Sequence, residues 1–413
     1  MLRTVSCVPA LRRKFAWQCL LLVPLSAQVT TTTIRGSVSD QSGGVVPNAQ
    51  VVVTATETGQ SRTTQTSGDG QFLVEFLPVG AYNLEISVAG FKKFAQSGIE
   101  LELNRVARVD AQLEIGSAVE TGAVNSDPSL VNTNNASIAR MSDSTEIENL
   151  PIVNRNVYTL LELTPGVKSS VSNIVLGYPE QRTMINGGVD GGAGSVSYYL
   201  DGGNNMTGLR NTGNMNPNPD AIEEFLVITN GYSAEYGRLA GGVINVITKS
   251  GSNSFHGSLF EFLRNTVLNA NVWAPGGTLT KLPLHRNQFG GTFGGPIKRN
   301  RTFFFGTYQG LRQISTTLLN SAVVPTPLER TGNFSQDKNQ PIDPTTKLPF
   351  PDGMIPMTRF DPTALNILNK YVPLANEAQN AYQAQIPSPY NSNEVLVKVD
   401  HYFSQAQRFS ASY

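Results

Sequence analysis

The segment from Ala221 to Ser250 constrains the fold more than any other part of the chain. It reads AIEEFLVITNGYSAEYGRLAGGVINVITKS, so that two runs of β-branched and aromatic residues flank a glycine-rich stretch. Such runs favour strands of a covered sheet, and glycine accepts the positive φ or close backbone approach that a tight turn requires. The segment predicts two buried strands joined by a tight turn. Taken alone, it also fits a glycine-punctuated hairpin of any β-rich domain.

The first 27 residues have the pattern of a secretory signal peptide. Four basic residues precede an apolar run from Phe15 to Leu25, and Ser26-Ala27 offers a small-residue cleavage site. A membrane anchor is the alternative, but the run is shorter than the roughly 20 residues of a spanning helix. Both cysteines, Cys7 and Cys19, lie in this segment, so neither a disulfide framework nor a thiolate metal site is expected after it.

Charge and apolar content argue against a nucleic-acid-binding protein and against a protein with a membrane-spanning helix after residue 27. After residue 27 the chain has 27 basic and 31 acidic residues, and this balance gives no support to nucleic-acid binding. No later segment has eighteen consecutive apolar residues, so a membrane-spanning part of this chain is expected to be a β-barrel.

Residues 30–115 are predicted to form a small β-sandwich. Short alternating strands are separated by turn clusters such as Asp40-Gln41-Ser42-Gly43-Gly44 and Ser67-Gly68-Asp69-Gly70. The phrases IRGSVSDQSGGVVPNAQVVV and TSGDGQFLVEFLPVGAYNLEISVAGF resemble the carboxypeptidase regulatory-like domain, a transthyretin-like sandwich of the carbohydrate-binding-like folds. The resemblance implies no peptidase. We expect the aromatic residues to be core rather than a sugar platform; they are Phe72, Phe76, Tyr82 and Phe91.

Residues 116–145 are polar and are predicted to be a linker. Residues 146–250 contain a predicted amphipathic helix, about Val157 to Leu163, ended by Pro165-Gly166. They continue with INGG and SYYLDG and end with the Ala221 to Ser250 segment. In this order and spacing the phrases resemble the plug domain of TonB-dependent outer-membrane receptors. The glycine-rich stretch from Gly187 lacks the ending and following helix of a phosphate loop, so we do not expect nucleotide binding.

Residues 251–413 are predicted to be the start of an outer-membrane β-barrel. Expected strands are 254–263, 287–297, 302–312, 394–403 and 408–413, joined alternately by long and short connections, with a long external loop at about 313–393. A soluble sandwich is the alternative, although so long an excursion is uncommon inside a compact domain. Lipid-facing and interfacial aromatics are expected at Phe289, Phe293, Phe303 to Phe305, Tyr308, Tyr402 and Phe403.

The phrases RNQFGGTFGGPIKRNRTFFFGTYQGLR and VPTPLERTGNFS resemble the first strands and first long loop of Oar-like TonB-dependent receptors. The predicted fold is mainly β: a transthyretin-like sandwich, an α+β plug, and the first strands of an incomplete barrel. A closed transporter barrel has about 22 strands, so we expect this sequence to be the N-terminal part of a longer protein. An adhesin or glycan-binding scaffold without transport and an inactive truncated remnant are the alternatives.

The resemblance implies active uptake or export of a scarce ligand in the outer membrane of a Gram-negative cell, with the plug and sandwich on the periplasmic side. It implies TonB with its inner-membrane energising complex and outer-membrane lipid as partners. The ligand stays open among oligosaccharide, peptide, siderophore and protein. The implied TonB-box candidate is Val119, Glu120, Thr121, Gly122, Ala123 and Val124. The implied plug motif is Asn186, Gly187, Asp201, Gly202, Glu235, Tyr236, Gly237, Arg238, Gly241, Gly242 and Asn245.

No catalytic or metal site is expected. The three histidines, His256, His285 and His401, are far apart and lack the HExxH spacing of a zinc site. No Gly-x-Ser-x-Gly elbow occurs. We therefore expect neither an enzyme nor a cofactor.

Overall fold

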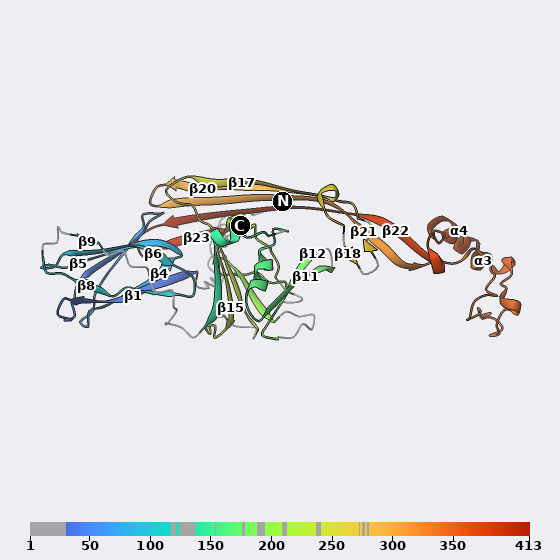
Figure 1. Cartoon of the computed structure of the whole chain (residues 1–413), viewed down its shortest axis with the longest axis horizontal. Helices are drawn as coiled ribbons and strands as arrows, with labels where there is room; N and C mark the ends of the chain where they lie inside the picture. The colour runs from blue at the N-terminus through green and yellow to red at the C-terminus, as the bar shows by residue number, and fades with distance from the viewer. Residues whose placement is uncertain are drawn as a thin grey trace, which may run out of the picture. The chain divides into compact units, whose positions relative to one another are not determined.

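The computed structural model is mainly β, as the sequence predicts (Figure 1). It describes residues 30–116, 121–123, 137–152, 154–175, 178–187, 195–208, 213–236, 241–271, 273–274, 277–278 and 281–413. The chain divides into two compact units. The first comprises Met1–Ser258, Gly291–Tyr308 and Val395–Tyr413, and the second comprises Leu259–Gly290 and Gln309–Glu394.

The N-terminal part of the first unit is a sandwich of two sheets, called the sandwich below. One sheet has the order β4-β1-β7, with β8 also paired to β1, and the other has the order β3-β2-β5-β6-β9. Alternate residues of β1, β2, β4, β5 and β6 point into one apolar core, which includes Ile34, Val51 and Leu84. The strands are β1 (Thr31–Asp40), β2 (Gln50–Ala55), β3 (Ser61–Gln65), β4 (Gln71–Pro78), β5 (Gly80–Ser87), β6 (Lys93–Leu101), β7 (Val106–Arg108), β8 (Ala111–Leu113) and β9 (Thr121–Ala123).

The aromatic residues of the sandwich mostly serve its core. Phe72 and Tyr82 are buried within it and Phe91 packs against it, whereas Phe76 is exposed. The Tyr82 hydroxyl donates to the carbonyl of Pro78 at 2.9 Å, which gives this buried polar group a partner.

The second part of the first unit is built on a five-stranded sheet of order β10-β15-β16-β13-β14, called the central sheet below. All seven residues of β16 are buried, as the β-branched run predicts. Both faces carry apolar clusters. The strands are β10 (Ile138–Asp143), β13 (Val196–Leu200), β14 (Gly203–Asn204), β15 (Ile222–Asn230) and β16 (Gly242–Thr248).

Two short helices cover one face of the central sheet. Asp143 caps α2 (Ser144–Asn149) by accepting from the Glu146 amide. The segment predicted as an amphipathic helix is instead a 3-10 helix, η1 (Val157–Leu163), which buries Val157, Tyr158, Leu160 and Leu161. A further 3-10 turn is η2 (Pro219–Ala221), and β11 (Val167–Val175) pairs with β12 (Tyr178–Ile185).

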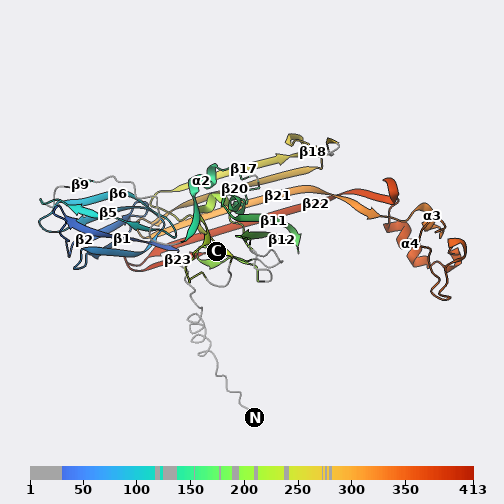
Figure 2. The same cartoon turned by 60° about the horizontal axis from the view of Figure 1, so that its bottom comes forward.

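A second five-stranded sheet has the order β17-β20-β21-β22-β23 and is called the C-terminal sheet below. Figures 1 and 2 show β17, β20, β21 and β22 side by side. The strands are β17 (His256–Asn265), β20 (Leu284–Lys298), β21 (Thr302–Val323), β22 (Ala381–Tyr402) and β23 (Arg408–Ser412); the short β18 (Trp273–Ala274) pairs with β19 (Gly277–Thr278) after the 3-10 turn η3 (Thr266–Leu268).

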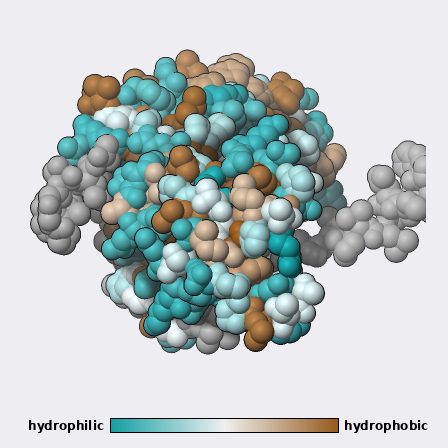
Figure 3. All heavy atoms as spheres, turned by 90° about the vertical axis from the view of Figure 1, so that its right-hand side faces the viewer, coloured by the Kyte–Doolittle hydropathy of each residue, from teal (hydrophilic) through white to brown (hydrophobic). Residues whose placement is uncertain are grey.

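The long connection differs from the expected loop at about 313–393, because β21 continues to Val323 and β22 begins at Ala381. Polar residues that alternate in these extensions suit a strand as well as a loop, which explains the difference. The connection contains α3 (Pro327–Arg330), η4 (Pro351–Gly353), η5 (Met357–Arg359), α4 (Pro362–Tyr371) and η6 (Ala378–Asn380). Figure 3 shows hydrophobic residues scattered among hydrophilic ones on the face viewed there.

The expectation that Phe303 to Phe305 all face lipid is wrong. Phe303 and Phe305 are fully buried, and Phe305 forms an apolar cluster with Ala221 and Leu396. Phe304 lies between them on the opposite face of β21, where it contacts Phe293 at a centroid distance of 5.6 Å. Strand alternation explains the correction, because neighbouring residues must point to opposite faces.

Candidate functional site

Asp201 organises the end of the central sheet. Asp201 and Gly202 follow β13 with φ of 48° and 77°, a left-handed turn that favours Asp and Gly. The turn places the carboxylate beside the last residue of β16. Asp201 accepts a hydrogen bond from the Thr248 amide at 2.9 Å and another from the Thr248 hydroxyl at 2.5 Å.

A lysine of the C-terminal sheet completes this group. Nζ of Lys398, on β22, donates to the Thr248 carbonyl at 2.9 Å and lies 3.2 Å from the Asp201 carboxylate and 3.3 Å from the Thr248 hydroxyl. The side chain of Lys398 is 6% exposed and that of Asp201 is 12% exposed. Three acceptors surround the three ammonium protons, which is the arrangement that a buried lysine requires.

A second ion pair involves Asp400, which lies two residues after Lys398 on the same face of β22. Asp400 is almost fully buried, and its carboxylate contacts Nη2 of Arg408 on β23 at 2.7 Å. The Arg408 guanidinium also lies 5.7 Å from the centre of the Tyr402 ring. Together with Lys398, these residues line a cavity of about 440 Å³.

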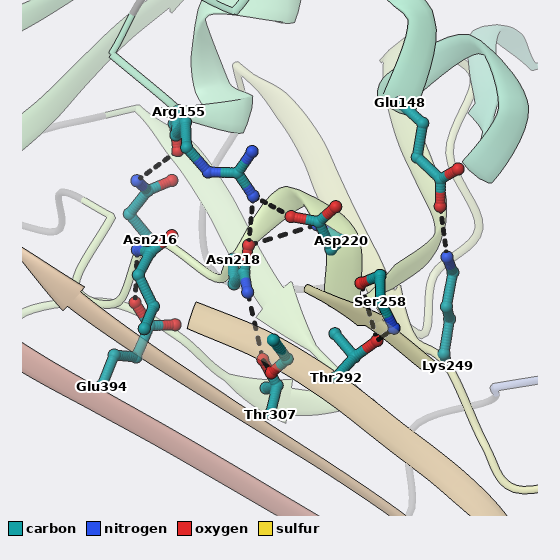
Figure 4. A network of polar contacts seen from close by, with 12 residues as sticks. Glu148, Arg155, Asn216, Asn218, Asp220, Lys249, Ser258, Thr292, Thr307 and Glu394 are labelled. Carbon is teal, nitrogen blue, oxygen red and sulfur yellow. Dashed lines mark hydrogen bonds and ion pairs between the residues drawn. The ribbon is translucent and has the colours of Figure 1, made fainter. Parts of the chain in front are cut away.

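A separate polar cluster forms around Arg155 (Figure 4). The buried Arg155 donates to the side-chain carbonyl of Asn218 at 2.6 Å and forms an ion pair with Asp220. The amide nitrogen of Asn218 in turn donates to the Thr307 hydroxyl on β21 at 3.0 Å. This cluster is a second buried polar link between the central-sheet region and the C-terminal sheet.

The predicted motif residues that the structure describes have structural roles around the central sheet. Asn186, with φ of 53°, donates to the Thr229 carbonyl at 3.0 Å, and Gly187 follows with φ of 74°. A Cβ at Gly241 would lie 2.6 Å from the Ser195 hydroxyl oxygen, and one at Gly242 would lie 2.6 Å from Ile185 Cδ1. Asn245 is buried on β16.

Tyr236 packs into the apolar cluster on the second face of the central sheet, and Glu235 precedes it in an exposed turn. Burial, with a smaller contribution from Glu235, raises the pKa of Tyr236 to about 12. Gly237 and Arg238 lie outside the described residues. The structure thus joins Asp201 to a site but gives the glycines a packing role.

The segment predicted as a TonB box is only partly described. Val119, Glu120 and Val124 lie outside the described residues. The backbone of Thr121, Gly122 and Ala123 forms β9, which pairs in parallel with residues 93–95 of β6.

Sequence reasoning missed Lys398, Asp400, Arg155 and Asn218. A signal for the first two is present in EVLVKVD, residues 394–400. Leu396, Lys398 and Asp400 are buried on one side of β22, whereas Val395 and Val397 are 53% and 44% exposed on the other. Charged residues that alternate with exposed valines mark the polar inner face of a membrane barrel strand.

Glu224 is a buried carboxyl group on β15. Burial, reinforced by the nearby carboxylates of Glu102, Glu223 and Asp143, raises its pKa to about 8, although the hydrogen bond from the Leu103 amide acts in the opposite direction. That amide lies 3.0 Å from the Glu224 carboxylate.

We expect the ionisation of Glu224 to lower the free energy of unfolding as pH rises. Because its folded pKa lies above the ordinary value of 4.5, the neutral form is favoured by folding, and this stability is present below pH 4.5 and lost as pH approaches 8. Glu224→Gln should therefore raise the melting temperature at pH 8 and leave it unchanged at pH 4.5, measured by calorimetry of the full-length protein in detergent. Glu75→Gln, at an exposed glutamate, is the control. Equal effects at both pH values would contradict the assignment.

Within the described residues, no group of three or more His, Cys, Asp or Glu side chains is placed to hold a metal ion. None of the helices in the same ranges has the length and apolar character of a membrane span.

Comparisons with known proteins match both ends of the chain. Residues 33–114 match the carboxypeptidase regulatory-like domain family, and residues 247–413 match the outer membrane beta barrel domain family. The TonB-dependent transporter Oar of Myxococcus xanthus is 31% identical over 306 residues, which are 70% of this chain and 27% of that protein. The chain thus spans about a quarter of the length of this relative.

Similar solved structures include the outer membrane transporter YddB of Escherichia coli, with 12% identity and a TM-score of 0.39 over 64% of this chain and 31% of that one. A catechol 1,2-dioxygenase mutant of Acinetobacter radioresistens has 16% identity and a TM-score of 0.18 over 24% of this chain and 56% of that one. At these scores, neither likeness carries an argument.

Proposed function

Because this chain belongs to the Oar-like TonB-dependent receptors of the outer membrane, we propose that it supplies the sandwich, the plug and the first barrel strands of a receptor that moves a scarce ligand across that membrane. In this proposal residues 146–250 are the plug, and the strands after them are the start of the barrel wall. The sandwich and the plug are on the periplasmic side.

The contact between Lys398 and Asp201 is the observation that carries the proposal. Asp201 belongs to a phrase that resembles a plug motif, and Lys398 lies on a strand inside the region matched by the barrel family. Burying an ammonium group is costly unless its partners are in place. A strand of a barrel wall that carries such a lysine needs a partner inside the barrel, and a plug provides it.

The two polar links suit a plug that is held and then moved. The Lys398 contact and the chain from Arg155 through Asn218 to Thr307 are both buried, so few water molecules compete with them at rest. When TonB, driven by the inner-membrane proton gradient, pulls on the linker, these contacts would break and water would solvate the separated groups. The same polar groups would reform the contacts after release. No catalytic step is needed for this cycle.

Deleting residues 119–124 tests the role of TonB. The proposal expects the deletion variant to reach the outer membrane but to lose binding to the isolated periplasmic domain of TonB, measured with outer-membrane vesicles. A deletion of equal length at residues 127–132 of the same linker is the control. Unchanged TonB binding after the 119–124 deletion would overturn the assignment of the TonB box. Binding by neither variant nor the unaltered protein would favour an adhesin or scaffold without energised transport.

A further inference from the structure

The sandwich touches the central sheet through a residue that its own core does not use. Leu103, in the turn between β6 and β7, is 3% exposed, yet it belongs to the apolar cluster of Tyr199, Leu226 and Ile247 on the second face of the central sheet. The neighbouring contact from the Leu103 amide to Glu224 is 3.0 Å long. Asn104 adds a hydrogen bond of 2.7 Å to Ser137, the residue before β10. An inserted leucine surrounded by polar contacts is the pattern of a specific interface.

A second turn of the sandwich, between β2 and β3, contacts the C-terminal sheet. The Glu57 carbonyl accepts from the Asn253 amide at 2.9 Å, just before β17. Gln60 donates to the Asn300 carbonyl in the short turn between β20 and β21. Gly59, with φ of 67°, lies so close that a Cβ there would be 2.7 Å from the Asn300 side-chain oxygen.

From these two sets of contacts we infer that the sandwich is a clamp that holds the plug to the barrel wall and must detach before the plug can move. This inference rests on the proposed function. A body bonded both to the central sheet and to the turns of the C-terminal sheet prevents relative movement of the two. Any displacement of the central sheet must break either the Leu103 contacts or the Gly59 contacts.

The linker joins the sandwich directly to the central sheet in the sequence, so a pull on the linker acts on both. The last strand of the sandwich is β9, which pairs with β6, and the central sheet begins with β10 at Ile138. A force applied to the linker between them is therefore carried both by the end of the sandwich and by β10. The same pull that loads the plug also loads the clamp.

Force spectroscopy of the full-length protein in outer-membrane vesicles tests the clamp. The pull is applied through a covalent peptide tag inserted within residues 125–136, so that neither a ligand nor TonB is needed. We expect an early rupture event before the central sheet yields. Leu103→Ser should shorten the lifetime of the state before this event about tenfold or more, because burial of a leucine side chain is lost. An unchanged lifetime would overturn the clamp.

Leu101→Ser is the matched control, because Leu101 lies two residues earlier but belongs to the core of the sandwich itself. It should also weaken β1 to β8, seen as faster hydrogen exchange across the sandwich, whereas Leu103→Ser should leave that exchange unchanged. Faster exchange throughout the sandwich in Leu103→Ser would mean that Leu103 supports the sandwich and not the clamp.

A covalent lock tests the other set of contacts by comparing one variant in its oxidised and reduced states. The only cysteines of the sequence are Cys7 and Cys19, before the described residues, so Gly59→Cys with Asn300→Cys introduces a defined pair. A Cβ at position 59 would lie 3.3 Å from the side-chain carbon Cγ of Asn300, close enough for a disulfide. Oxidation should lengthen the lifetime of the state before the early event, because only the Leu103 contacts can then break, and reduction should restore the shorter lifetime. Either single variant should behave the same in both conditions.

The clamp and the proposed function can fail independently of each other. Loss of TonB binding in the 119–124 deletion, together with an early event that Leu103→Ser and the lock leave unchanged, would keep the receptor and discard the clamp. An early event that responds to both changes in a protein that never binds TonB would keep the clamp as a property of the fold and discard the energised function.

Discussion

Lys398→Met is expected to lower the free energy of local unfolding at the end of β16 by about 3 kcal/mol, because breaking a buried ion pair leaves an uncompensated charge. The methionine fills a similar volume but leaves the Asp201 carboxylate and the Thr248 carbonyl without their buried donor. The readout is the Thr248 amide, which donates directly to Asp201. Its native-state hydrogen exchange should be about 100-fold faster in the variant.

A double-mutant cycle separates the ion pair from the packing of the lysine chain. Asn at position 201 still accepts a hydrogen bond from Thr248 but carries no charge, so Asp201→Asn combined with Lys398→Met should recover about half or more of the loss. Lys298→Met, at an exposed lysine at the end of β20, is the control and should leave Thr248 exchange unchanged. Additive effects of the two substitutions would mean that Asp201 and Lys398 do not interact.

Gly242→Ala is expected to lower the free energy of unfolding by about 3 kcal/mol or more and to prevent stable assembly of the central sheet. The residue has φ of 147°, which side chains rarely adopt. A Cβ there would lie 2.6 Å from Ile185 Cδ1 and 2.8 Å from the Ile228 carbonyl oxygen, and both isoleucines are buried. Strain and overpacking therefore add at one position.

Protease resistance of the full-length protein in outer-membrane vesicles measures this effect. We expect cleavage within residues 195–248 of the Gly242→Ala variant under conditions that leave the unaltered protein intact. Gly208→Ala is the matched control, because a Cβ at Gly208 meets no atom within 4 Å. A Gly242→Ala variant that resists protease as well as the control would show that the central sheet accepts a side chain at this position.

The strands of the central sheet could be predicted because their signals are local. The run from Ile222 to Asn230 and the run from Gly242 to Thr248 each carry enough β-branched residues to specify a buried strand by themselves. The turn at Asp201 and Gly202 is equally local, because it depends on the φ preference of adjacent residues.

The candidate site could be predicted only in part, because its partners are distant in sequence. Asp201 and Lys398 are 197 positions apart, and nothing near Lys398 indicates which carboxylate it meets. Arg155 and Asn218 each stand in polar phrases that fit an ordinary loop. Loop closure over such distances depends on the packing of whole sheets, which strand periodicity does not encode.

The ends of β21 and β22 were also beyond local signals. Residues 313–323 and 381–393 mix polar and small residues with scattered apolar ones. Such a segment becomes a strand when a neighbouring strand supplies hydrogen-bond partners, and β21 and β22 supply them to each other. Sequence alone left these residues in the expected loop.

The central claim is that this chain is part of an outer-membrane barrel that encloses a plug, and gel mobility of the outer-membrane product tests it most directly. An antibody against residues 221–250 would detect the protein in outer-membrane fractions, with and without boiling in detergent. We expect a band well above the 44.6 kDa of this sequence that changes mobility on boiling, because closed barrels resist detergent until heated. A product confined to the soluble periplasmic fraction, with the same mobility before and after boiling, would contradict it.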